Sequence, residues 1–419
     1  MYNISILTIG DEICIGQITN TNASWLAAKC TELGANVVTH SSIRDDKQEM
    51  VDELNRLIPK SDLLIITGGL GPTHDDITKQ VLAEYFKDEL VTDKDWEAHL
   101  IKFFNKRGYV LTERNRAQAL VPNSSKVLSN SIGTAPGLLF EVDGKKIIAL
   151  PGVPSEMKAI FIDNISSIIK SDMIVRNDDV LVYKNFQVSG IPESKLADLI
   201  GETDKFLDGG SLAFLPSFKG IRLRVGVKAK SFEEGISKIG LIEKVLYERA
   251  GGFIYGQNDD SLVSKVGEYL VQSKSTVSVA ESCTGGLLGA EFTKISGSSE
   301  YFVGGGIVYS NEAKINILGV DSETLMKHGA VSEEVVKELA RNVRTKFRTD
   351  FGIGITGIAG PTGGTEEKPV GTVWIGLSDE KVTIAQRFVF GNDRDMNRER
   401  AVGTALNMLL KRLKNFKDS

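Results

Sequence analysis

The chain has 419 residues, of which 41% are hydrophobic and 25% are charged. At about 150 residues per domain this length predicts two or three domains, and the composition excludes a largely disordered chain. Fifty basic residues against 55 acidic ones give a net charge of −5. An acidic chain without a Lys/Arg-rich block is a poor non-specific binder of nucleic acid or of an anionic membrane.

The number and spacing of the cysteines indicate the cellular compartment of the protein. Cys14, Cys30 and Cys283 form no C-x-x-C pair and no cluster with histidine. A disulfide framework and structural zinc are therefore not expected, and a reducing cytoplasm is favoured. The longest uncharged apolar runs fall far short of the roughly 20 residues that a membrane span needs, and a basic region typical of a secretory signal is missing. We expect a cytoplasmic protein without membrane contact.

The first 170 residues predict a wound α/β sheet. Strand-like and helix-like segments alternate along them: Ile4–Ile9, the helix Asn22–Leu33, Asn36–Thr39, Asp62–Ile66, a helix from Ile77, and Lys145–Leu150. Such alternation is typical of a mostly parallel sheet with helices on both faces.

The rest of the chain predicts a small module and a second α/β block. Residues 171–255 contain three strand patterns and two helices, which indicates an α+β module. From residue 256, strands at Val277–Ala280 and Phe351–Ile355 alternate with helices such as Ser332–Phe347. The predicted fold class is α/β, with two three-layer α/β/α domains (1–170 and 256–419) joined by the module at 171–255.

A glycine-rich loop lies between a strand and a helix of the first domain. Gly68, Gly69 and Gly71 would let backbone N–H groups approach a phosphate beside a helix N-terminus. The alternative is a tight turn with Asp75 as the helix N-cap and His74 on the surface.

Acidic residues follow two strands of this domain. Asp75 and Asp76 point roughly 100° apart on a helix, so one is expected to cap and the other to face the loop. Together with Asp11 and Glu12, Asp76 is a candidate ligand for a divalent cation, because hard cations prefer carboxylate oxygens.

The last domain has a hydroxyl at a strand end. Ser282 is a candidate nucleophile with backbone amides nearby for an oxyanion, and a capping serine is the alternative. Cys283 is a rival nucleophile, but no local basic partner predicts a lowered thiol pKa. Lys314 becomes a candidate base only if it is buried. The loop Gly360–Gly364 is rich enough in glycine to close over a ligand.

Together these segments resemble the CinA family, competence/damage-inducible protein A. The matching motifs occur in order over nearly the whole chain: Gly10–Glu12, Gly16–Ile18, Asn20–Asn22, Gly68–Asp76, Leu150–Met157, Ala280–Gly286, Gly297–Ser299, Tyr309–Lys314, His328–Ser332, Thr356–Pro361, Glu366–Trp374 and Asp393–Arg398.

The resemblance implies two activities. The first domain is similar to molybdopterin-binding domains and is linked in this family to a divalent-metal-dependent ADP-ribose pyrophosphatase. The match places Asn22 and the glycine loop at the substrate. Asp76 is the acid most expected to face the phosphates and the metal, with Asp11 and Glu12 as second choices. The last domain looks like a nicotinamide-nucleotide amidase that converts NMN to nicotinic acid mononucleotide and ammonia without a cofactor. The module is similar to a KH-type fold, but it lacks an obvious GxxG clamp, so RNA binding is not expected.

For the amidase, the match places Ser282, Ser299, Tyr309, Lys314, Thr356 and Arg398 around the substrate, with Thr284, Gly285 and Gly360 as further contacts. Ser282 is then the nucleophile and a desolvated Lys314 its base, with Ser299 as relay or oxyanion donor. The reverse assignment of the two serines stays open. Tyr309 and Thr356 would position the amide or ribose, and Arg398, or alternatively Arg394, would pair with the 5′-phosphate.

Two other functions remain as alternatives. A molybdopterin-handling protein is suggested by the first domain, and a DNA-uptake or recombination accessory is suggested only by the family name. The net charge of −5 disfavours the second. A homodimer is expected.

Overall fold

The computed structural model describes residues 1–73, 76–217 and 220–417. The predicted N-cap Asp75 and the surface residue His74 therefore lie outside the described residues. The chain groups into two compact units, residues 1–183 with 226–240 and residues 184–225 with 241–419.

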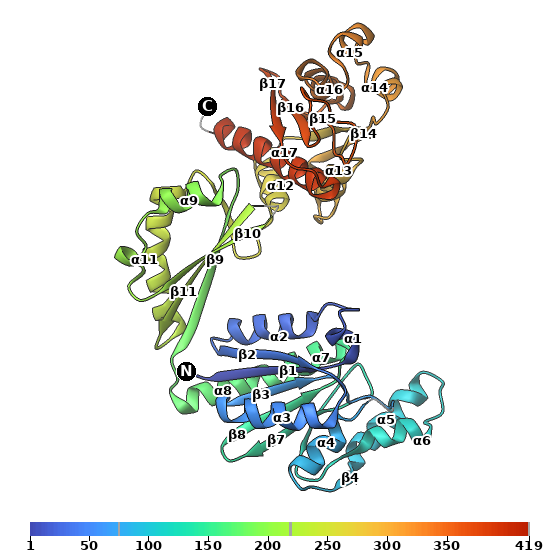
Figure 1. Cartoon of the computed structure of the whole chain (residues 1–419), viewed down its shortest axis with the longest axis vertical. Coiled ribbons are helices and arrows are strands. Elements are labelled where there is room, and N and C mark those ends of the chain that lie inside the picture. Colours follow the sequence, from blue (N-terminus) through green and yellow to red (C-terminus); the bar gives the residue numbers. More distant parts are fainter. Residues whose placement is uncertain (74–75, 218–219, 418–419) are drawn as a thin grey trace. The chain divides into compact units, whose positions relative to one another are not determined.

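The first unit is built on a six-stranded sheet in the order β2-β1-β3-β8-β7-β6 (Figure 1). Strands β2, β1, β3 and β8 are parallel, and β7 and β6 continue the sheet in antiparallel fashion. The strands are β1 (Asn3–Ile9), β2 (Asn36–Ile43), β3 (Leu63–Thr67), β6 (Lys126–Leu128), β7 (Gly137–Val142) and β8 (Lys145–Leu150). Strand β2, which follows β1 in sequence, lies on one side of β1. Strand β3 and the later strands lie on the other side of β1. The carboxyl ends of β1 and β3 thus form a topological switch point, where ligands of open α/β sheets bind.

Helices cover both faces of this sheet. Leu7 and Ile9 of β1 join the core formed with α3 and α4, whereas Ile4 and Ile6 are buried on the opposite face. On that face Trp25 of α2 meets Phe161 edge to face at 5.3 Å. The remaining elements are α1 (Asp11–Cys14), α2 (Thr21–Glu32), α3 (Lys47–Leu57), α4 (Thr78–Tyr85), β4 (Leu90–Thr92), α5 (Lys94–Lys106), α6 (Glu113–Arg116), β5 (Leu120–Pro122), α7 (Pro154–Ile160) and α8 (Ser166–Arg176), with short helical turns at Ile58–Lys60, Ala117–Ala119 and Phe161–Ile165.

The central module contains a four-stranded sheet in the order β10-β11-β9-β12. Its elements are β9 (Val180–Val188), α9 (Glu193–Ile200), α10 (Asp204–Leu207), β10 (Ser211–Ser217), β11 (Gly220–Ala229), α11 (Phe232–Ala250) and β12 (Ile254–Gln257). Strand β12 returns to pair antiparallel with β9, so the sheet of the module continues to Gln257.

The last part of the second unit is a five-stranded sheet in the order β14-β13-β15-β16-β17. Strands β14, β13 and β15 are parallel, and β16 and β17 are antiparallel additions. Its elements are α12 (Leu262–Gln272), β13 (Val277–Glu281), α13 (Leu287–Thr293), a 3-10 turn (Ser298–Glu300), β14 (Phe302–Ile307), α14 (Asn311–Leu318), α15 (Ser322–His328), α16 (Glu333–Phe347), β15 (Phe351–Gly357), β16 (Thr372–Ser378), β17 (Thr383–Val389) and α17 (Arg394–Lys417).

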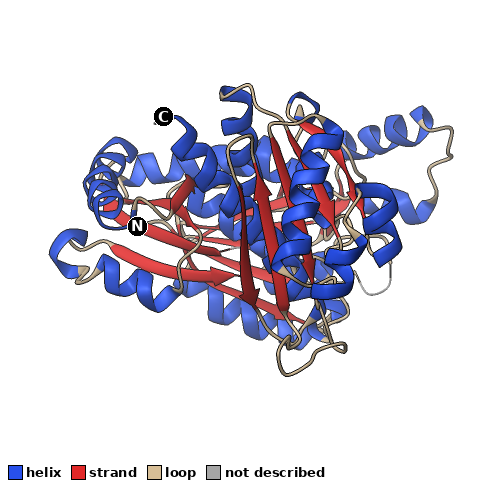
Figure 2. Cartoon of the chain, turned by 90° about the horizontal axis from the view of Figure 1, so that it is seen from above, coloured by secondary structure: helices blue, strands red, loops and turns tan. Residues whose placement is uncertain are grey.

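Two cores enclose this sheet. Side chains of α12, α13 and α17 pack on one face and those of α14, α15 and α16 on the other, and Figure 2 distinguishes the strands from the helices that flank them. The predicted fold class is therefore confirmed: two three-layer α/β/α domains and an α+β module between them. Among the described residues, no helix combines the length and apolarity that crossing a bilayer requires.

Helix α16 approaches its sheet closely because the strands beneath it carry glycines. A Cβ added to Gly352 of β15 would lie 2.1 Å from the carbonyl oxygen of Ala340, and one added to Gly376 of β16 would lie 2.6 Å from that of Val336. Neither backbone can move aside without separating the helix from the strand.

We expect Gly352→Ala to lower the thermal midpoint of the chain, because overpacking of this kind costs about 1–3 kcal/mol. Gly403→Ala is the matched control, since nothing lies within 4 Å of its added Cβ inside α17. That substitution should raise stability by up to ~1 kcal/mol, because alanine is the better helix former. Calorimetry of both variants checks this, and an unchanged midpoint for Gly352→Ala would contradict the packing argument.

Candidate active site

A buried serine–lysine pair lies at the carboxyl ends of the parallel strands in the last domain. Ser282 follows β13 directly, and Lys314 lies on the first turn of α14. The Nζ of Lys314 lies 3.1 Å from the Oγ of Ser282, and the lysine side chain is only 1% exposed. Its amine also donates to the carbonyl oxygens of Val308 and Tyr309, each at 2.9 Å. The pair needs tertiary contact, because 32 residues separate its members in sequence.

The surroundings of Lys314 suit both protonation states of its amine. A neutral amine has two N–H donors and one lone pair, which match two carbonyl oxygens and one hydroxyl proton. An ammonium has three donors, which match the same three oxygens after the proton has moved. Burial lowers the pKa of Lys314 below its usual range, and the nearby Cys283 opposes this in part. A proton can thus pass from Ser282 to Lys314 with little movement of heavy atoms.

The loop that carries Ser282 is held by a carboxylate. Glu281 is 1% exposed and accepts from the backbone N–H groups of Gly286, Leu288 and Gly289 at 2.8–3.1 Å. These are the amides at the start of α13, so Glu281 occupies the anion-binding end of that helix. Sequence reasoning missed this role. The available signal was a carboxylate that ends a buried strand just before a helix start.

Backbone N–H groups beside Ser282 remain open. In the described part of the chain, neither Cys283 nor Thr284 donates its backbone N–H to another residue. Gly285 and Gly286 have φ angles of 63° and 96°, which glycine adopts readily, and they turn the chain sharply after Ser282. Amides that donate to no other residue suit an oxygen that becomes negative during a reaction.

The predicted substrate residues surround this loop. Arg398 donates to the carbonyl oxygen of Thr284 at 3.1 Å, and the hydroxyl of Thr284 is buried without a partner among the described atoms. Arg394 donates to the carbonyl oxygen of Gly360 at 2.8 Å and lies 3.4 Å from the hydroxyl of Tyr309, which is 62% exposed.

Of the other two predicted residues, Thr356 lies beside Ser282 and Ser299 lies apart. The carbonyl oxygen of Ile355, the residue before Thr356, accepts the backbone N–H of Ser282 at 3.0 Å. The hydroxyl of Thr356, at the end of β15, donates to the carbonyl oxygen of Ala330 at 2.8 Å and is buried. Ser299 lies on the exposed 3-10 turn before β14, at the opposite end of that strand from Ser282. One chain therefore brings Ser282 and Lys314 together but does not bring Ser299 to them.

In the first unit, Asp76 organises the glycine loop. Its carboxylate accepts from the N–H groups of Gly71 at 2.7 Å and Thr73 at 2.8 Å, and from the hydroxyl of Thr73. Gly68 and Gly69 are required by packing, because an added Cβ would lie 2.1 Å from the Ile9 carbonyl oxygen and 2.3 Å from the Thr78 hydroxyl, respectively. The conformation of the glycine loop is therefore held largely by contacts within the first unit itself.

Asn22 connects the loops that follow β3 and β8. Its amide nitrogen donates to the carbonyl oxygen of Gly152 at 2.8 Å and to the hydroxyl of Thr67 at 3.3 Å. Its amide oxygen is buried without a partner among the described atoms. The residue therefore joins the ends of β3 and β8, where a ligand of this sheet is expected.

The described residues do not form a metal centre by themselves. No group of three His, Cys, Asp or Glu side chains in the described ranges is arranged to hold an ion. Both oxygens of Asp76 are occupied by its loop, while Asp11 and Glu12 are exposed at the start of α1. A cation at this edge would need most of its ligands from a bound substrate and water.

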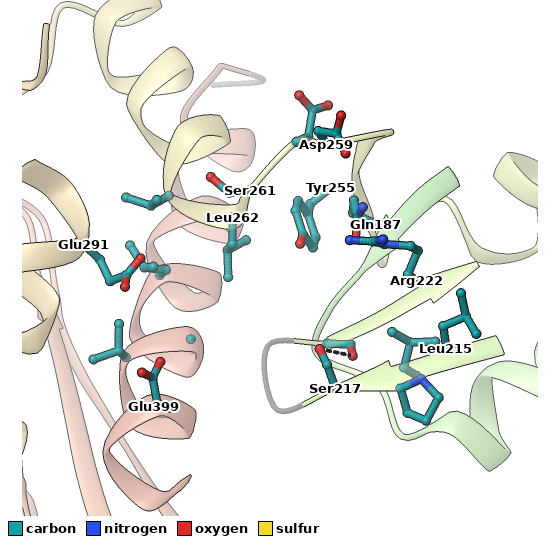
Figure 3. Close-up of a pocket in the computed structure, with 18 residues that line it drawn as sticks. Gln187, Leu215, Ser217, Arg222, Tyr255, Asp259, Ser261, Leu262, Glu291 and Glu399 are labelled. Carbon is teal, nitrogen blue, oxygen red and sulfur yellow. Dashed lines mark hydrogen bonds between the residues drawn. The ribbon is translucent and has the colours of Figure 1, made fainter. Parts of the chain in front are cut away.

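A separate cavity of about 460 Å³ lies within the second unit (Figure 3). Asp259, Glu291 and Glu399 line it, with Arg222 and Tyr255 facing them from the module. None of the predicted site residues belongs to its lining. Its acidic character disfavours a nucleotide phosphate.

Models of known families match most of the chain in three parts. Residues 5–170 match the "Probable molybdopterin binding domain", residues 183–256 match the "Damage-inducible protein CinA KH domain", and residues 259–413 match the "CinA C-terminal domain".

Two relatives match this chain over nearly their whole length. A CinA-like protein of Cytophaga hutchinsonii is 40% identical over 98% of both chains, and one of Salinibacter ruber is 40% identical over 96% of this chain and 97% of its own. A solved CinA protein of unknown function from Thermoplasma acidophilum is 38% identical, covers 40% of this chain and 97% of its own, and has a TM-score of 0.37.

Fold and site together define a protein with a molybdopterin-binding-like domain and an α/β domain that carries a buried serine–lysine pair. The chain belongs to the CinA family.

We expect Cys283 to resist alkylation in the folded protein. Burial raises the pKa of the Cys283 thiol to about 12 and that of Cys30 to about 12, whereas Cys14 is exposed. Since the thiolate is the reactive form, iodoacetamide at pH 7.5 should label Cys14 alone, and all three cysteines after denaturation. Mass spectrometry of tryptic peptides measures this. Rapid labelling of native Cys283 would restore it as a rival nucleophile.

Proposed function

We propose that the C-terminal domain hydrolyses the carboxamide of NMN to nicotinic acid mononucleotide and ammonia. The observation that carries this proposal is the buried amine of Lys314, 3.1 Å from the hydroxyl of Ser282. A serine is a weak nucleophile until an adjacent base takes its proton, and a desolvated lysine can do so. Family membership and the matched motifs supply the substrate class.

In the proposed reaction, neutral Lys314 takes the hydroxyl proton of Ser282 as its Oγ attacks the carboxamide carbon. The proton then passes from Lys314 to the leaving amine, and ammonia departs from an ester on Ser282. Water, deprotonated by neutral Lys314, hydrolyses that ester to the carboxylate and restores the hydroxyl. The open N–H groups of Cys283 and Thr284 would hold the oxyanion in both steps.

Two arginines on consecutive turns of α17 would bind the substrate phosphate. Arg394 is exposed and already contacts Tyr309 and Gly360, while Arg398 is half-buried against Thr284. A guanidinium suits a phosphate because it can donate two parallel hydrogen bonds. In this proposal Ser282 is the nucleophile, since Ser299 has no contact with Lys314 in the same chain.

We expect Ser282→Ala to lose several powers of ten in NMN turnover, because the nucleophile is gone. Lys314→Met should lose a comparable factor, and Lys314→Arg should not rescue it, because a guanidinium stays protonated. Ammonia release measures all three rates. Ser310→Ala is the control, since Ser310 caps α14 through Ala313 but does not contact the amine. Turnover by Ser282→Ala close to that of the parent would reject the mechanism.

The proposed role of Lys314 as the base determines whether kcat/KM rises or falls with pH. Only neutral Lys314 can accept the proton, so kcat/KM should rise with pH and level off above the lysine's pKa. Because burial lowers that pKa, the plateau should begin below the pH at which an ordinary lysine titrates. Stopped-assay profiles from pH 6 upwards test this expectation.

We further propose that the N-terminal domain cleaves ADP-ribose to AMP and ribose 5-phosphate. The supporting observation is the switch point of the sheet, where Asn22 joins the ends of β3 and β8. A divalent cation that arrives with the pyrophosphate would neutralise charge on its oxygens. Asp11 and Glu12 are the side chains with exposed carboxylates to contact it, because Mg²⁺ is usually held by one or two carboxylates plus substrate phosphates.

We expect EDTA to abolish ADP-ribose cleavage and to leave NMN deamidation largely intact. Asp11→Asn with Glu12→Gln should raise the Mg²⁺ concentration needed for half-maximal cleavage at least tenfold, since two of its ligands are lost. Asp76→Asn should lower the rate without changing that concentration, because Asp76 shapes the loop instead. Product chromatography on the full chain measures both. Loss of deamidation on chelation would contradict the serine mechanism, and adenylylation of molybdopterin instead of ADP-ribose cleavage would favour the alternative function.

A further inference from the structure

The turn between β13 and α13 is held by side chains from two different elements. Its residues Gly285 and Gly286 have φ angles of 63° and 96°, and glycine adopts many other backbone angles as readily, so the shape of the turn depends on its hydrogen bonds. The carboxylate of Glu281 accepts the N–H groups at the start of α13. Arg398, from α17, donates to the carbonyl oxygen of Thr284 from its Nε at 3.3 Å and from its Nη2 at 3.1 Å. One carboxylate and one guanidinium therefore hold this turn.

The carbonyl group that Arg398 holds lies close to the candidate nucleophile. Thr284 is two residues after Ser282, and its carbonyl oxygen also accepts the N–H of Leu287 at 3.3 Å. The backbone N–H of Thr284 is one of the two that would hold the oxyanion. Each residue has only two soft backbone angles, so a hydrogen bond that fixes its carbonyl limits how its N–H can turn. Arg398 can thus orient that N–H without contact with the reacting carbon.

Arg398 keeps hydrogen-bond donors for a second partner. A guanidinium carries five N–H groups in a fixed plane, and Nε and one N–H of Nη2 are enough to reach the Thr284 carbonyl. Its Nη1 donates to the carboxylate of Asp395 at 3.2 Å, a side chain that is 87% exposed. Such an exposed ion pair contributes little to stability, so a phosphate can replace the carboxylate at small cost. One guanidinium can therefore hold a carbonyl oxygen and a phosphate at the same time.

The helix that carries Arg398 is anchored in the same domain. Asn397, which is 1% exposed, donates to the carbonyl oxygen of Ala359 at 3.0 Å. Ala401 and Val402, one turn further along α17, are buried in the core that α12 and α13 share. The backbone under the guanidinium is thus held in place, and the freedom that remains belongs to the side chain of Arg398. A phosphate bound to that side chain would remove this freedom.

We propose that Arg398 is a positioning residue that couples the phosphate of the substrate to the turn after Ser282. The phosphate fixes the guanidinium, the guanidinium fixes the Thr284 carbonyl, and the N–H of Thr284 is then aligned with the oxyanion. Binding energy from a part of the substrate that does not react can orient the groups that do, so the phosphate raises kcat as well as affinity. The site therefore selects a phosphorylated carboxamide nucleotide over its nucleoside in the chemical step. This inference rests on the proposed amidase function.

The coupling is tested with NMN and with nicotinamide riboside, which has the same carboxamide but no phosphate. Single-turnover rates at saturating substrate report the chemical step separately from binding and product release. We expect Arg398→Gln to lower the NMN rate at least about tenfold and the riboside rate less than about twofold, because only NMN gains from the aligned turn. Inorganic phosphite, which resembles the missing group, should accelerate riboside turnover by the parent chain but not by Arg398→Gln.

Two other arginines of α17 supply matched controls. Arg394→Gln removes the same charge one turn earlier, and Arg394 contacts Gly360 and Tyr309 instead of the turn after Ser282. It should raise KM for NMN while the single-turnover rate changes much less than in Arg398→Gln. Arg400→Gln makes the same change on the same helix at a residue outside the candidate site, and it should match the parent chain with both substrates.

Each alternative role of Arg398 gives a different result. Equal losses with NMN and with the riboside in Arg398→Gln would make Arg398 a purely structural contact of the turn. A raised KM for NMN with an unchanged single-turnover rate would make it a phosphate ligand only. Either result, or equal parental rates for the two substrates, would overturn the coupling while the amidase function stands. A parent chain that turns over neither substrate would reject the amidase function, and this inference with it.

Discussion

The C-terminal domain depends on keeping one amine out of water. Lys314 is 1% exposed, and its Nζ has three oxygen partners, two of them main-chain carbonyls at the end of β14. A buried amine is costly unless each hydrogen-bonding position is used. The strand end, the start of α14 and the turn at Ser282 must therefore adopt one arrangement. That same arrangement places the amine 3.1 Å from the hydroxyl of Ser282.

Glycines allow the layers to come close enough for this arrangement. Gly352 and Gly354 of β15 lie under the carbonyl oxygens of α16, and Gly285 and Gly286 turn the chain between β13 and α13. Glu281 then fixes the turn by accepting three amides of α13. Glu281 thus holds the turn in place. The backbone N–H groups of Cys283 and Thr284 beside it donate to no other residue in the described part of the chain, so they could stabilise a negative oxygen.

The two α/β domains combine related topology with different sets of polar side chains. In each, a loop after a parallel strand is held by a carboxylate that accepts backbone amides: Asp76 in the first and Glu281 in the last. At the ends of its strands the first domain has exposed carboxylates and the buried amide oxygen of Asn22, which has no partner among the described atoms. The last domain has a serine, a lysine and arginines there. For this reason the proposed reaction of the first domain uses a cation and that of the last domain does not.

The sequence by itself determined the fold class and the position of Ser282 at a strand end, because hydrophobic periodicity and glycine turns are local signals. It did not reveal β7 and β17, whose pairing is set by neighbouring strands. The burial of Lys314, the capture of Asp76 by its own loop and the separation of Ser299 from Ser282 came only from tertiary structure. Each depends on contacts between segments that the fold brings together or holds apart, and residue type at a given spacing does not report burial or distance.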